Sequence, residues 1–239
     1  MEKAVYIQEL KKPNLPTTKM NCDDCIDTKL TTYPMIQDAF SKTSFNVVLG
    51  GMGMGKTSLI VSLIRGVFKK CFHSIYVIMP PNSRASLEND IFSKLPEDQV
   101  YDDLTENVLN DIYEKAKNDS SEGYYTLLII DDFQNMFKQT NIEKLLQKLI
   151  LKMRHIRTTT FLLQQNVKSL PRNLRMLVSN YITFDLGKSQ MMDLFEESIQ
   201  LDKNKFQEVM DLGFKQKYDW LLINLRNKNI YSKFDRIIY

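Results

Sequence analysis

The chain has 239 residues, a length that suits one α/β domain or one domain with an appendage. It is 43% hydrophobic and 26% charged, an ordinary balance for a globular protein that can bury a proper core. The formal net charge of only +3 excludes a global polycation, so any contact with nucleic acid must come from a local basic patch.

The cysteines and the N-terminus indicate where the protein acts. Cys22, Cys25 and Cys71 form a small, odd set, which indicates a reducing compartment without a disulfide framework. The "CDDC" at 22–25 has zinc-like spacing, but no second ligand pair follows, so a plain surface loop is the alternative. No signal-peptide core and no apolar window of about 18 residues is present. We therefore expect a protein that is not secreted, has no membrane span and acts in a cytosolic compartment.

The predicted elements begin after an N-terminal extension, residues 1–33, and continue through one domain at 34–239. A short helix is expected at 34–42, and the stretches 59–68, 104–113 and 142–153 have helical apolar spacing. Asn141 is placed to cap the last of these. Two more helices are expected near 189–200 and 203–211. Strands are predicted at 45–51, 74–80, 125–133, 158–165 and 180–186, and a closing strand pair at 218–226 and 229–239.

Strands that alternate with helices predict an α/β fold with a mostly parallel central sheet flanked by helices, which the C-terminal strand pair completes. In such sheets, ligands bind beyond the carboxyl ends of the strands. The glycine loop, the "DD" at 131–132 and the "QQ" at 164–165 each follow an apolar run at that end. We therefore expect these three polar clusters to converge.

The stretch "GGMGMGKTS" fits a P-loop, the phosphate-binding loop of nucleotide-binding proteins. Its glycines let several backbone N–H groups point at the phosphates, and the helix that follows presents its positive N-terminal end. Lys56 is expected to reach the β- and γ-phosphates, and Thr57 to bind Mg²⁺. The predicted nucleotide-binding residues are Gly50, Gly51, Met52, Gly53, Met54, Gly55, Lys56, Thr57 and Ser58.

Two acids follow the buried run "LLII" at 127–130. Asp131, at the strand end, is expected to hold the Mg²⁺ shell as a Walker B aspartate does. Asp132 would lie beside the attacking water, orient it and accept a proton. The alternative is that Asp132 only caps the next turn.

Three further candidates lie near the fourth strand. A neutral amide there can sense the γ-phosphate, and we favour Gln165, with Gln164 close behind; two surface glutamines are the alternative. Arg154 precedes the same strand and is the best candidate for an arginine that acts on a neighbouring subunit's ATP in a ring. Its alternative is a solvated cation at a helix C-terminus.

A basic stripe, Lys144, Lys148 and Lys152, lies opposite the apolar face of its predicted helix, and more cations follow at 168, 172 and 175. This stripe is either a surface that tracks DNA phosphates without reading sequence or simply the solvated face of a helix.

Taken together, these motifs resemble the genome-packaging ATPases of large DNA viruses and virophages, including the poxvirus-like family, within the FtsK–HerA group of ring-forming translocases. The matching stretches are "GGMGMGKTS", "LLIIDD", "MRHIRTTTFLLQQ", "LPRNLR" and "YDWLLINLRNKNIYSKFDRIIY", so the resemblance runs from about residue 34 to the end. The resemblance places the family's arginine site on Arg154 and the side-chain amide of its fourth-strand motif on Gln165. It places a basic residue that follows this motif on Arg175. The doubled glutamine and Asp132, where glutamate is usual, depart from the pattern.

The resemblance implies an ATP- and Mg²⁺-dependent motor that moves double-stranded DNA into a capsid. It implies a homo-oligomeric ring, contacts with capsid proteins, and a location in the host cytoplasm, the virus factory or the virion. Two alternatives stay open: a nucleotide-dependent switch that binds partners without moving DNA, and a P-loop kinase.

Overall fold

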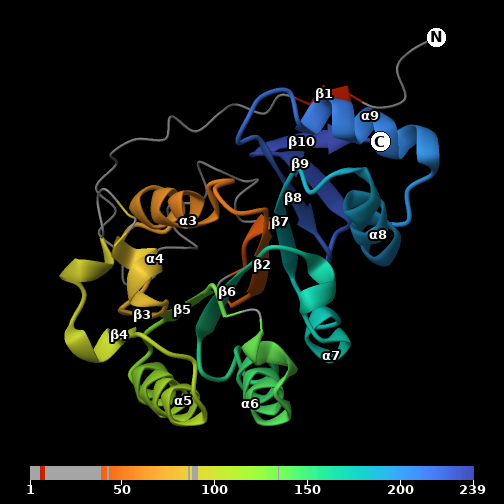
Figure 1. Ribbon diagram of the computed structural model, residues 1–239. Coiled ribbons are helices and arrows are strands. Elements are labelled where there is room, and N and C mark those ends of the chain that lie inside the picture. The colour runs from red at the N-terminus through yellow and green to blue at the C-terminus, as the bar shows by residue number, and fades with distance from the viewer. Residues whose placement is uncertain (1–5, 9–38, 42, 86, 88–90, 134) are drawn as a thin grey trace.

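The computed structural model describes residues 6–8, 39–41, 43–85, 87, 91–133 and 135–239. The described strands form one sheet in the order β1-β10-β9-β8-β7-β2-β6-β5-β3-β4 (Figure 1). In chain order these strands are β1 (Tyr6–Gln8), β2 (Phe45–Leu49), β3 (Ser74–Ile78), β4 (Val100–Tyr101), β5 (Thr126–Asp131), β6 (Thr158–Gln164), β7 (Asn180–Phe184), β8 (Trp220–Asn224), β9 (Asn229–Ser232) and β10 (Asp235–Ile238).

One half of the sheet is parallel, as the alternation of strands and helices predicted. It runs β7-β2-β6-β5-β3-β4, and Asp131 at the end of β5 stands beside Leu163 of β6. These strands carry continuous apolar runs, and every residue of β2, β5, β6 and β7 is buried. Such runs are typical of parallel strands that helices cover on both faces. The five parallel strands predicted from the sequence are therefore confirmed, and β4 is a short addition.

The other half of the sheet is antiparallel. Strand β8 pairs with β7, and β9 and β10 follow as a meander. The predicted second closing strand, 229–239, is therefore two strands, because the chain reverses at Lys233, whose φ is 56°. Strand β1, within the predicted N-terminal extension, pairs with β10 and forms the outer edge. The helix expected at 34–42 falls largely outside the described residues.

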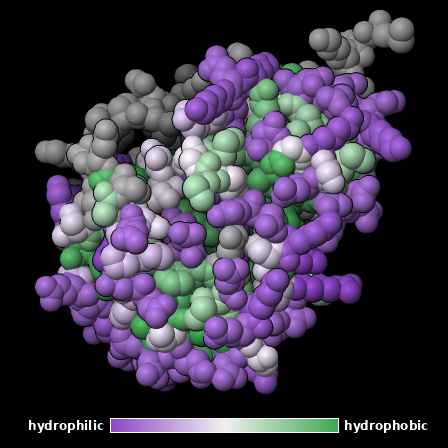
Figure 2. Space-filling view, viewed as in Figure 1, coloured by the Kyte–Doolittle hydropathy of each residue, from purple (hydrophilic) through white to green (hydrophobic). Residues whose placement is uncertain are grey.

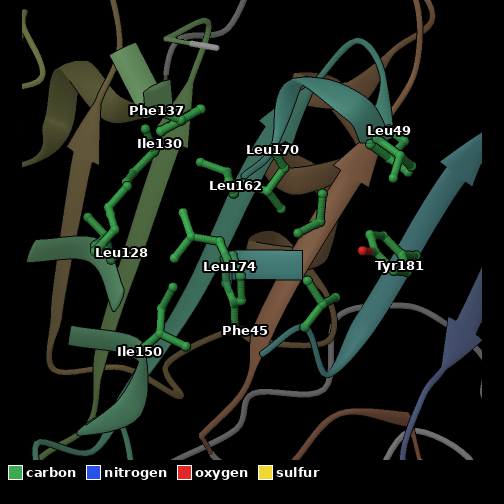
Figure 3. Packing of buried hydrophobic residues seen from close by; sticks show 14 of the residues in the cluster. Phe45, Leu49, Leu128, Ile130, Phe137, Ile150, Leu162, Leu170, Leu174 and Tyr181 are labelled. Atoms are coloured by element: carbon green, nitrogen blue, oxygen red, sulfur yellow. The ribbon is translucent and has the colours of Figure 1, made fainter. Parts of the chain in front are cut away.

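Helices lie on both faces of the sheet (Figure 1). The longer helices are α3 (Lys56–Arg65), α5 (Glu106–Ser121), α6 (Thr140–Leu151), α8 (Lys188–Ser198) and α9 (Lys203–Gly213), and short ones are α4 (Pro81–Ala85) and α7 (Arg172–Arg175). The core on the α5–α9 side joins strand residues such as Leu128 and Leu162 to Ile150 and Leu174 (Figure 3). A second core beneath α3 contains Ile60 and Phe161. The helices predicted after residue 45 are confirmed, with shifted ends.

The start of α6 corrects one prediction. The helix begins at Thr140 with Gln139 at the cap position, so Asn141 lies inside the first turn rather than capping it. Its side-chain amide instead donates to Glu106 Oε1 of α5 at 2.8 Å. Thr105, by contrast, does cap α5, because its hydroxyl accepts from the backbone N–H of Val108.

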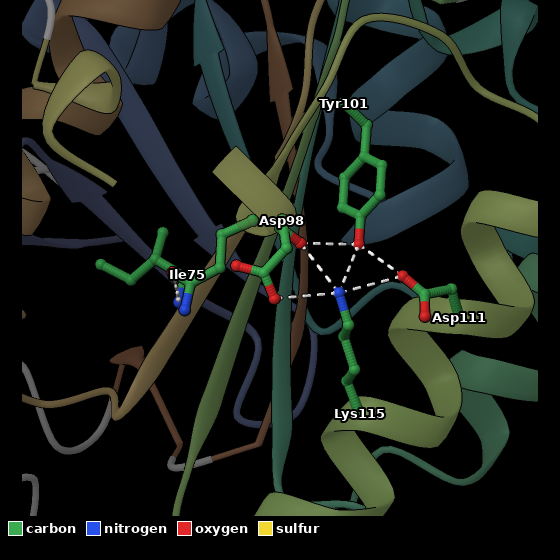
Figure 4. A network of polar contacts seen from close by, with 6 residues as sticks. Ile75, Asp98, Tyr101, Asp111 and Lys115 are labelled. Atoms are coloured by element: carbon green, nitrogen blue, oxygen red, sulfur yellow. Dashed lines mark hydrogen bonds and ion pairs between the residues drawn. The ribbon is translucent and has the colours of Figure 1, made fainter. Parts of the chain in front are cut away.

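A polar network joins the outer strand β4 to α5 (Figure 4). The Lys115 ammonium contacts Asp98 at 3.2 Å and Asp111 at 3.1 Å, and it donates to the Tyr101 hydroxyl at 3.1 Å. Tyr101 in turn donates to Asp111 at 2.6 Å. These contacts lie at the side of the sheet and fasten its last parallel strand to the helix layer.

The surface in Figure 2 is largely hydrophilic, with small separate apolar areas. Within the described ranges, no helix combines the length and apolar character that a membrane span needs. No group of three metal-ligating side chains occurs in that part of the chain either. Cys22 and Cys25 lie outside the described residues, so their predicted alternatives stay predictions.

Candidate active site

The three predicted polar clusters meet in one cavity at the carboxyl end of the sheet, the end at which its parallel strands finish. They meet because β6 lies between β2, which leads into the glycine loop, and β5, which ends at the acids. The cavity has a volume of about 470 Å³. Its lining includes Met52, Gly53, Gly55, Lys56, Thr57, Ser58, Asn82, Ser83, Asp131, Asp132, Gln164 and Gln165.

The glycine loop, residues 50–55, connects β2 to α3. Gly55 has a φ of 91°, a left-handed conformation that a residue with a Cβ rarely adopts. A Cβ on Gly50 would approach Phe184 Cδ2 to 2.9 Å. Helix α3 starts at Lys56 without a side-chain cap, so its first backbone N–H groups stay available for an anion. Gly50, Gly51 and Met54 shape the loop but do not line the cavity.

Lys56 lies across the loop. Its ammonium donates to the carbonyl oxygens of Gly50 at 2.8 Å and Gly51 at 3.1 Å. Burial lowers its pKa, an effect that the nearby charges of Asp131 and Asp132 oppose. A phosphate beside this partly desolvated cation would stabilise its charge. Lys56 therefore lies against the glycine loop, and its contact with the β- and γ-phosphates stays a prediction.

Thr57 and Asp131, the two predicted magnesium ligands, are in contact with each other. The Thr57 hydroxyl donates to Asp131 Oδ2 at 2.7 Å, which joins the start of α3 to the end of β5. Asp131 is only 5% exposed, and burial raises its pKa although the Thr57 bond and the Lys56 charge favour ionisation. A hydroxyl and a carboxylate beside a phosphate loop fit Mg²⁺, which prefers oxygen ligands and substrate phosphates.

Asp132 differs from its neighbour in being exposed and strained. Its φ is 66°, uncommon for a residue other than glycine, and such strain concentrates at functional sites. The Ser83 hydroxyl, from α4, donates to Asp132 Oδ2 at 3.1 Å. The carboxylate thus lines the cavity beside the Asp131 site, where it can orient a water molecule.

The two glutamines at the end of β6 have different environments. Gln164 is only 2% exposed; its Oε1 accepts from the Ser169 hydroxyl at 2.7 Å, and its Nε2 has no hydrogen-bond partner. A buried amide N–H without a partner costs free energy, and an acceptor atom of a ligand would relieve that cost. Gln165 is half-buried and follows the strand. Both line the cavity, and the orphaned donor is on Gln164.

Arg154 lies at the opposite, amino end of the sheet. It precedes β6, whose seven residues span about 23 Å. It is exposed and cannot reach the P-loop of its own chain. Burial lowers the pKa of Arg226, which follows β8. The nearby charge of Arg154 lowers the Arg226 pKa further. The structure therefore does not bring Arg154 into the cavity of its own subunit.

The predicted basic stripe divides into free and paired cations. Lys144 and Lys148 are exposed on α6, and Lys152 is exposed at its C-cap. The Lys148 ammonium lies 4.5 Å from the centre of the Tyr113 ring. Lys168, in contrast, pairs with Asp193 at 2.5 Å. Arg175 pairs with Glu197 at 3.2 Å and donates to the Leu170 carbonyl, so it braces α7 rather than lining the cavity.

The comparisons with known proteins show the family and the fold of this chain. The family model described as "Poxvirus A32 protein" matches residues 35–237. The chain belongs to the poxvirus A32 protein family. This match confirms the resemblance stated from the sequence. No curated protein matches the chain significantly.

Two solved structures share the fold of this A32 family member. The genome packaging NTPase B204 of Sulfolobus turreted icosahedral virus 2, in complex with ATP-gammaS, is 20% identical with a TM-score of 0.58. That match covers 80% of this chain and 96% of B204. The DNA-packaging ATPase B204 of Sulfolobus turreted icosahedral virus is 17% identical with a TM-score of 0.59, covering 78% and 95% of the two chains. The predicted fold class, a P-loop NTPase, is thereby confirmed.

Sequence reasoning missed two contributors to the site. Asn82 and Ser83 line the cavity, and they follow β3 at the same carboxyl end as the acids. The signal was present in "PPNS", since a polar pair comes a few residues after a buried strand. The prolines ended the predicted strand, and the residues after them were left within a long polar stretch.

Replacing Asp131 with Asn should stabilise the protein while removing its activity. Because burial raises the Asp131 pKa, the folded protein binds this proton more readily than the unfolded chain, and stability falls as pH rises through the raised pKa. At pH 7 the full cost is present, so Asp131→Asn should raise the nucleotide-free melting temperature by about 2–4 °C. The gain should shrink as pH falls and vanish below the ordinary Asp pKa of about 4, where the carboxyl group is protonated in the folded and the unfolded state alike. Hydrolysis of MgATP should fall at least about 100-fold.

Asp132→Asn is the matched control, because asparagine tolerates the same left-handed backbone. Since Asp132 is exposed, this variant should lose activity without gaining thermal stability. A melting curve that is unchanged in Asp131→Asn and Asp132→Asn alike would contradict the account of Asp131.

Proposed function

We propose that this protein is an ATP-driven motor that moves double-stranded viral DNA into a capsid. The observation that carries the proposal is the single cavity at which Lys56, the Thr57–Asp131 pair and Asp132 meet. The A32 family and a fold shared with viral packaging ATPases support the same conclusion. A kinase would instead need an acceptor site beside the γ-phosphate.

The chain's own residues account for hydrolysis as follows. Backbone N–H groups of the loop and the Lys56 ammonium hold the β- and γ-phosphates. Mg²⁺, held by Thr57 and Asp131, would neutralise phosphate charge. Asp132 orients the attacking water and accepts its proton, and the orphaned Nε2 of Gln164 donates to a γ-phosphate oxygen. We assign this role to Gln164 in preference to Gln165 because only Gln164 has the unpaired buried donor.

The subunits of the motor form a homo-oligomeric ring in this proposal. A ring places the amino end of one subunit's sheet against the carboxyl end of the next, so that Arg154 reaches the neighbour's γ-phosphate. Such an arrangement accounts for an exposed arginine that its own cavity cannot use. DNA phosphates bind the stripe formed by Lys144, Lys148 and Lys152, without sequence selection. Capsid proteins are the remaining partners, and the host cytoplasm or virus factory is the proposed location.

The test is ATP hydrolysis with and without long duplex DNA. We expect stimulation by DNA of any sequence, and weaker DNA binding at higher salt because counterions are released. Changing Lys144 and Lys152 to Gln should flatten that salt dependence, since two phosphate contacts are lost. Changing Lys138 and Lys203, which are exposed elsewhere, is the matched control. Slow hydrolysis that DNA leaves unchanged would favour a switch, and transfer of phosphate to a nucleoside would favour a kinase.

A further inference from the structure

A second cavity, of about 420 Å³, lies on the other side of the glycine loop from the acids. Gly53, Gly55 and Ser58 line both cavities, so the loop and the start of α3 form the wall between them. The rest of the second cavity comes from α3, the end of β7 and the start of β8. Its side chains are Leu59, Ser62, Phe184, Tyr218 and Trp220.

Sheet order fixes how these cavities flank the loop. Strand β2, which leads into the loop, has β6 and then β5 on one side, and β7 and then β8 on the other. Asp131, Asp132 and Gln164, which are proposed to act around the γ-phosphate, come from the β6–β5 side. A nucleoside triphosphate bound in the loop with its γ-phosphate there must direct its ribose and base the opposite way, toward β7 and β8.

We propose that this second cavity binds the base of the nucleotide, with the ring of Tyr218 as its stacking surface. The inference rests on the proposed function, because it takes the γ-phosphate position from it. The volume is within the range of small-molecule sites, and the lining is mainly apolar and aromatic. A purine has the flat, polarisable face that stacks well on such a ring.

Tyr218 is exposed, so its ring is available for such a stacking contact. Its side chain is 49% exposed, and its φ of 71° is a strained conformation for a tyrosine. A Cβ on Gly55 would lie 3.6 Å from Tyr218 Cδ1, so the ring stands directly beside the phosphate loop. Phe184 and Trp220 are buried behind it and provide a rigid floor, since they pair across β7 and β8.

Asp219 positions the turn that carries Tyr218. Its Oδ2 accepts from the backbone N–H groups of Lys215 at 3.0 Å and Gln216 at 2.8 Å. Its Oδ1 pairs with the Lys233 ammonium at 2.7 Å. The Lys217 ammonium lies 4.9 Å from the centre of the Tyr218 ring. The contacts of Asp219 therefore hold the strained backbone of Tyr218 in place, as is common where strain occurs at a binding site.

The residues that line the second cavity also determine which bases it should accept. Among the described residues of this cavity there is no carboxylate and no side-chain amide that could read the polar edge of a base. The serine hydroxyls are those of Ser58 and Ser62, and Ser62 already donates to the Ser58 carbonyl. The third hydroxyl belongs to Tyr218, the proposed stacking ring. Stacking area should therefore decide affinity. We expect ATP and GTP to bind within a few fold of each other, and CTP and UTP more weakly.

The decisive experiment compares a ligand with a base and one without. Calorimetry on the full chain would measure ATP and inorganic tripolyphosphate binding to wild type, Tyr218→Ala and Tyr218→Phe. Tyr218→Ala should weaken the binding of ATP about tenfold and leave the binding of tripolyphosphate unchanged, because only ATP has a base that can stack on the ring. Tyr218→Phe, which keeps the ring, should recover most of the affinity. Tyr124→Ala, a change to another exposed tyrosine, is the control.

Two results would overturn the base site and leave the ATPase proposal intact. ATP affinity that is unchanged in Tyr218→Ala would show that the base lies elsewhere. Equal weakening of ATP and tripolyphosphate would show that Tyr218 supports the shape of the loop instead. The proposed function would fail separately, if wild-type protein bound neither ligand or if Lys56→Ala left both affinities unchanged.

Discussion

Lys56→Ala should abolish ATP hydrolysis, with a loss of at least about 10³-fold in kcat. The Lys56 ammonium lies against the phosphate loop, where it bonds to the Gly50 and Gly51 carbonyls. Removing this ammonium takes away the positive charge that would stabilise the transferring phosphoryl group. It also removes two hydrogen bonds to the loop. Steady-state phosphate release at saturating MgATP measures the effect.

The control for this variant is Lys138→Ala, because Lys138 is an exposed lysine far along the chain from the loop. It should hydrolyse ATP at the wild-type rate. Circular dichroism should show Lys56→Ala to be folded, since burial lowers the pKa of this lysine and its charge is not a source of stability. Hydrolysis that survives in folded Lys56→Ala would contradict the P-loop assignment.

Arg154→Ala should lower ATP hydrolysis by about 10³-fold or more, while nucleotide binding to the isolated subunit stays unchanged. The physical reason is position: Arg154 lies at the amino end of the sheet, about one strand length from its own cavity. A charge at that distance in water cannot stabilise the γ-phosphate within the same chain. It can do so only across a subunit interface.

Mixing subunits distinguishes action between chains from a local defect. In a ring assembled from equal amounts of Arg154→Ala and Lys56→Ala subunits, about one quarter of the interfaces carry both native residues. Activity should therefore reappear on mixing. Arg65→Ala, which removes another exposed arginine, should neither lose activity alone nor restore it in mixtures. Mixtures no more active than their separate components would reject the role between subunits.

Much of the chemistry could be predicted because it is local in the chain. The glycine loop, Lys56 and Thr57 lie within one strand–loop–helix unit, and glycine is needed there for a backbone reason that the sequence itself displays. Asp131 follows a run of apolar residues long enough to be a buried strand, so its place at a strand end was predictable. The alternation of such units also predicted a parallel sheet.

Local reasoning was wrong where packing decided the outcome. Asn141 has the chemistry of a cap, but α6 starts at Thr140, two residues earlier than predicted, and the Asn141 amide bonds to Glu106 instead. The closing strand pair is a meander, because a turn at Lys233 divides its second strand. Neither the first turn of a helix nor the reversal of a strand is fixed by hydrophobic period alone.

The sequence by itself determined which groups this protein has for phosphate chemistry and that each follows a strand. Tertiary structure alone decided which strands are neighbours, and so which groups meet. It placed β6 between the loop and the acids, exposed Asp132 while burying Asp131, and left Arg154 at the far end of the sheet. It also brought Tyr218 beside Gly55 through the pairing of β7 with β8. The reason is that strand order depends on long-range packing of apolar faces, which local periodicity does not encode.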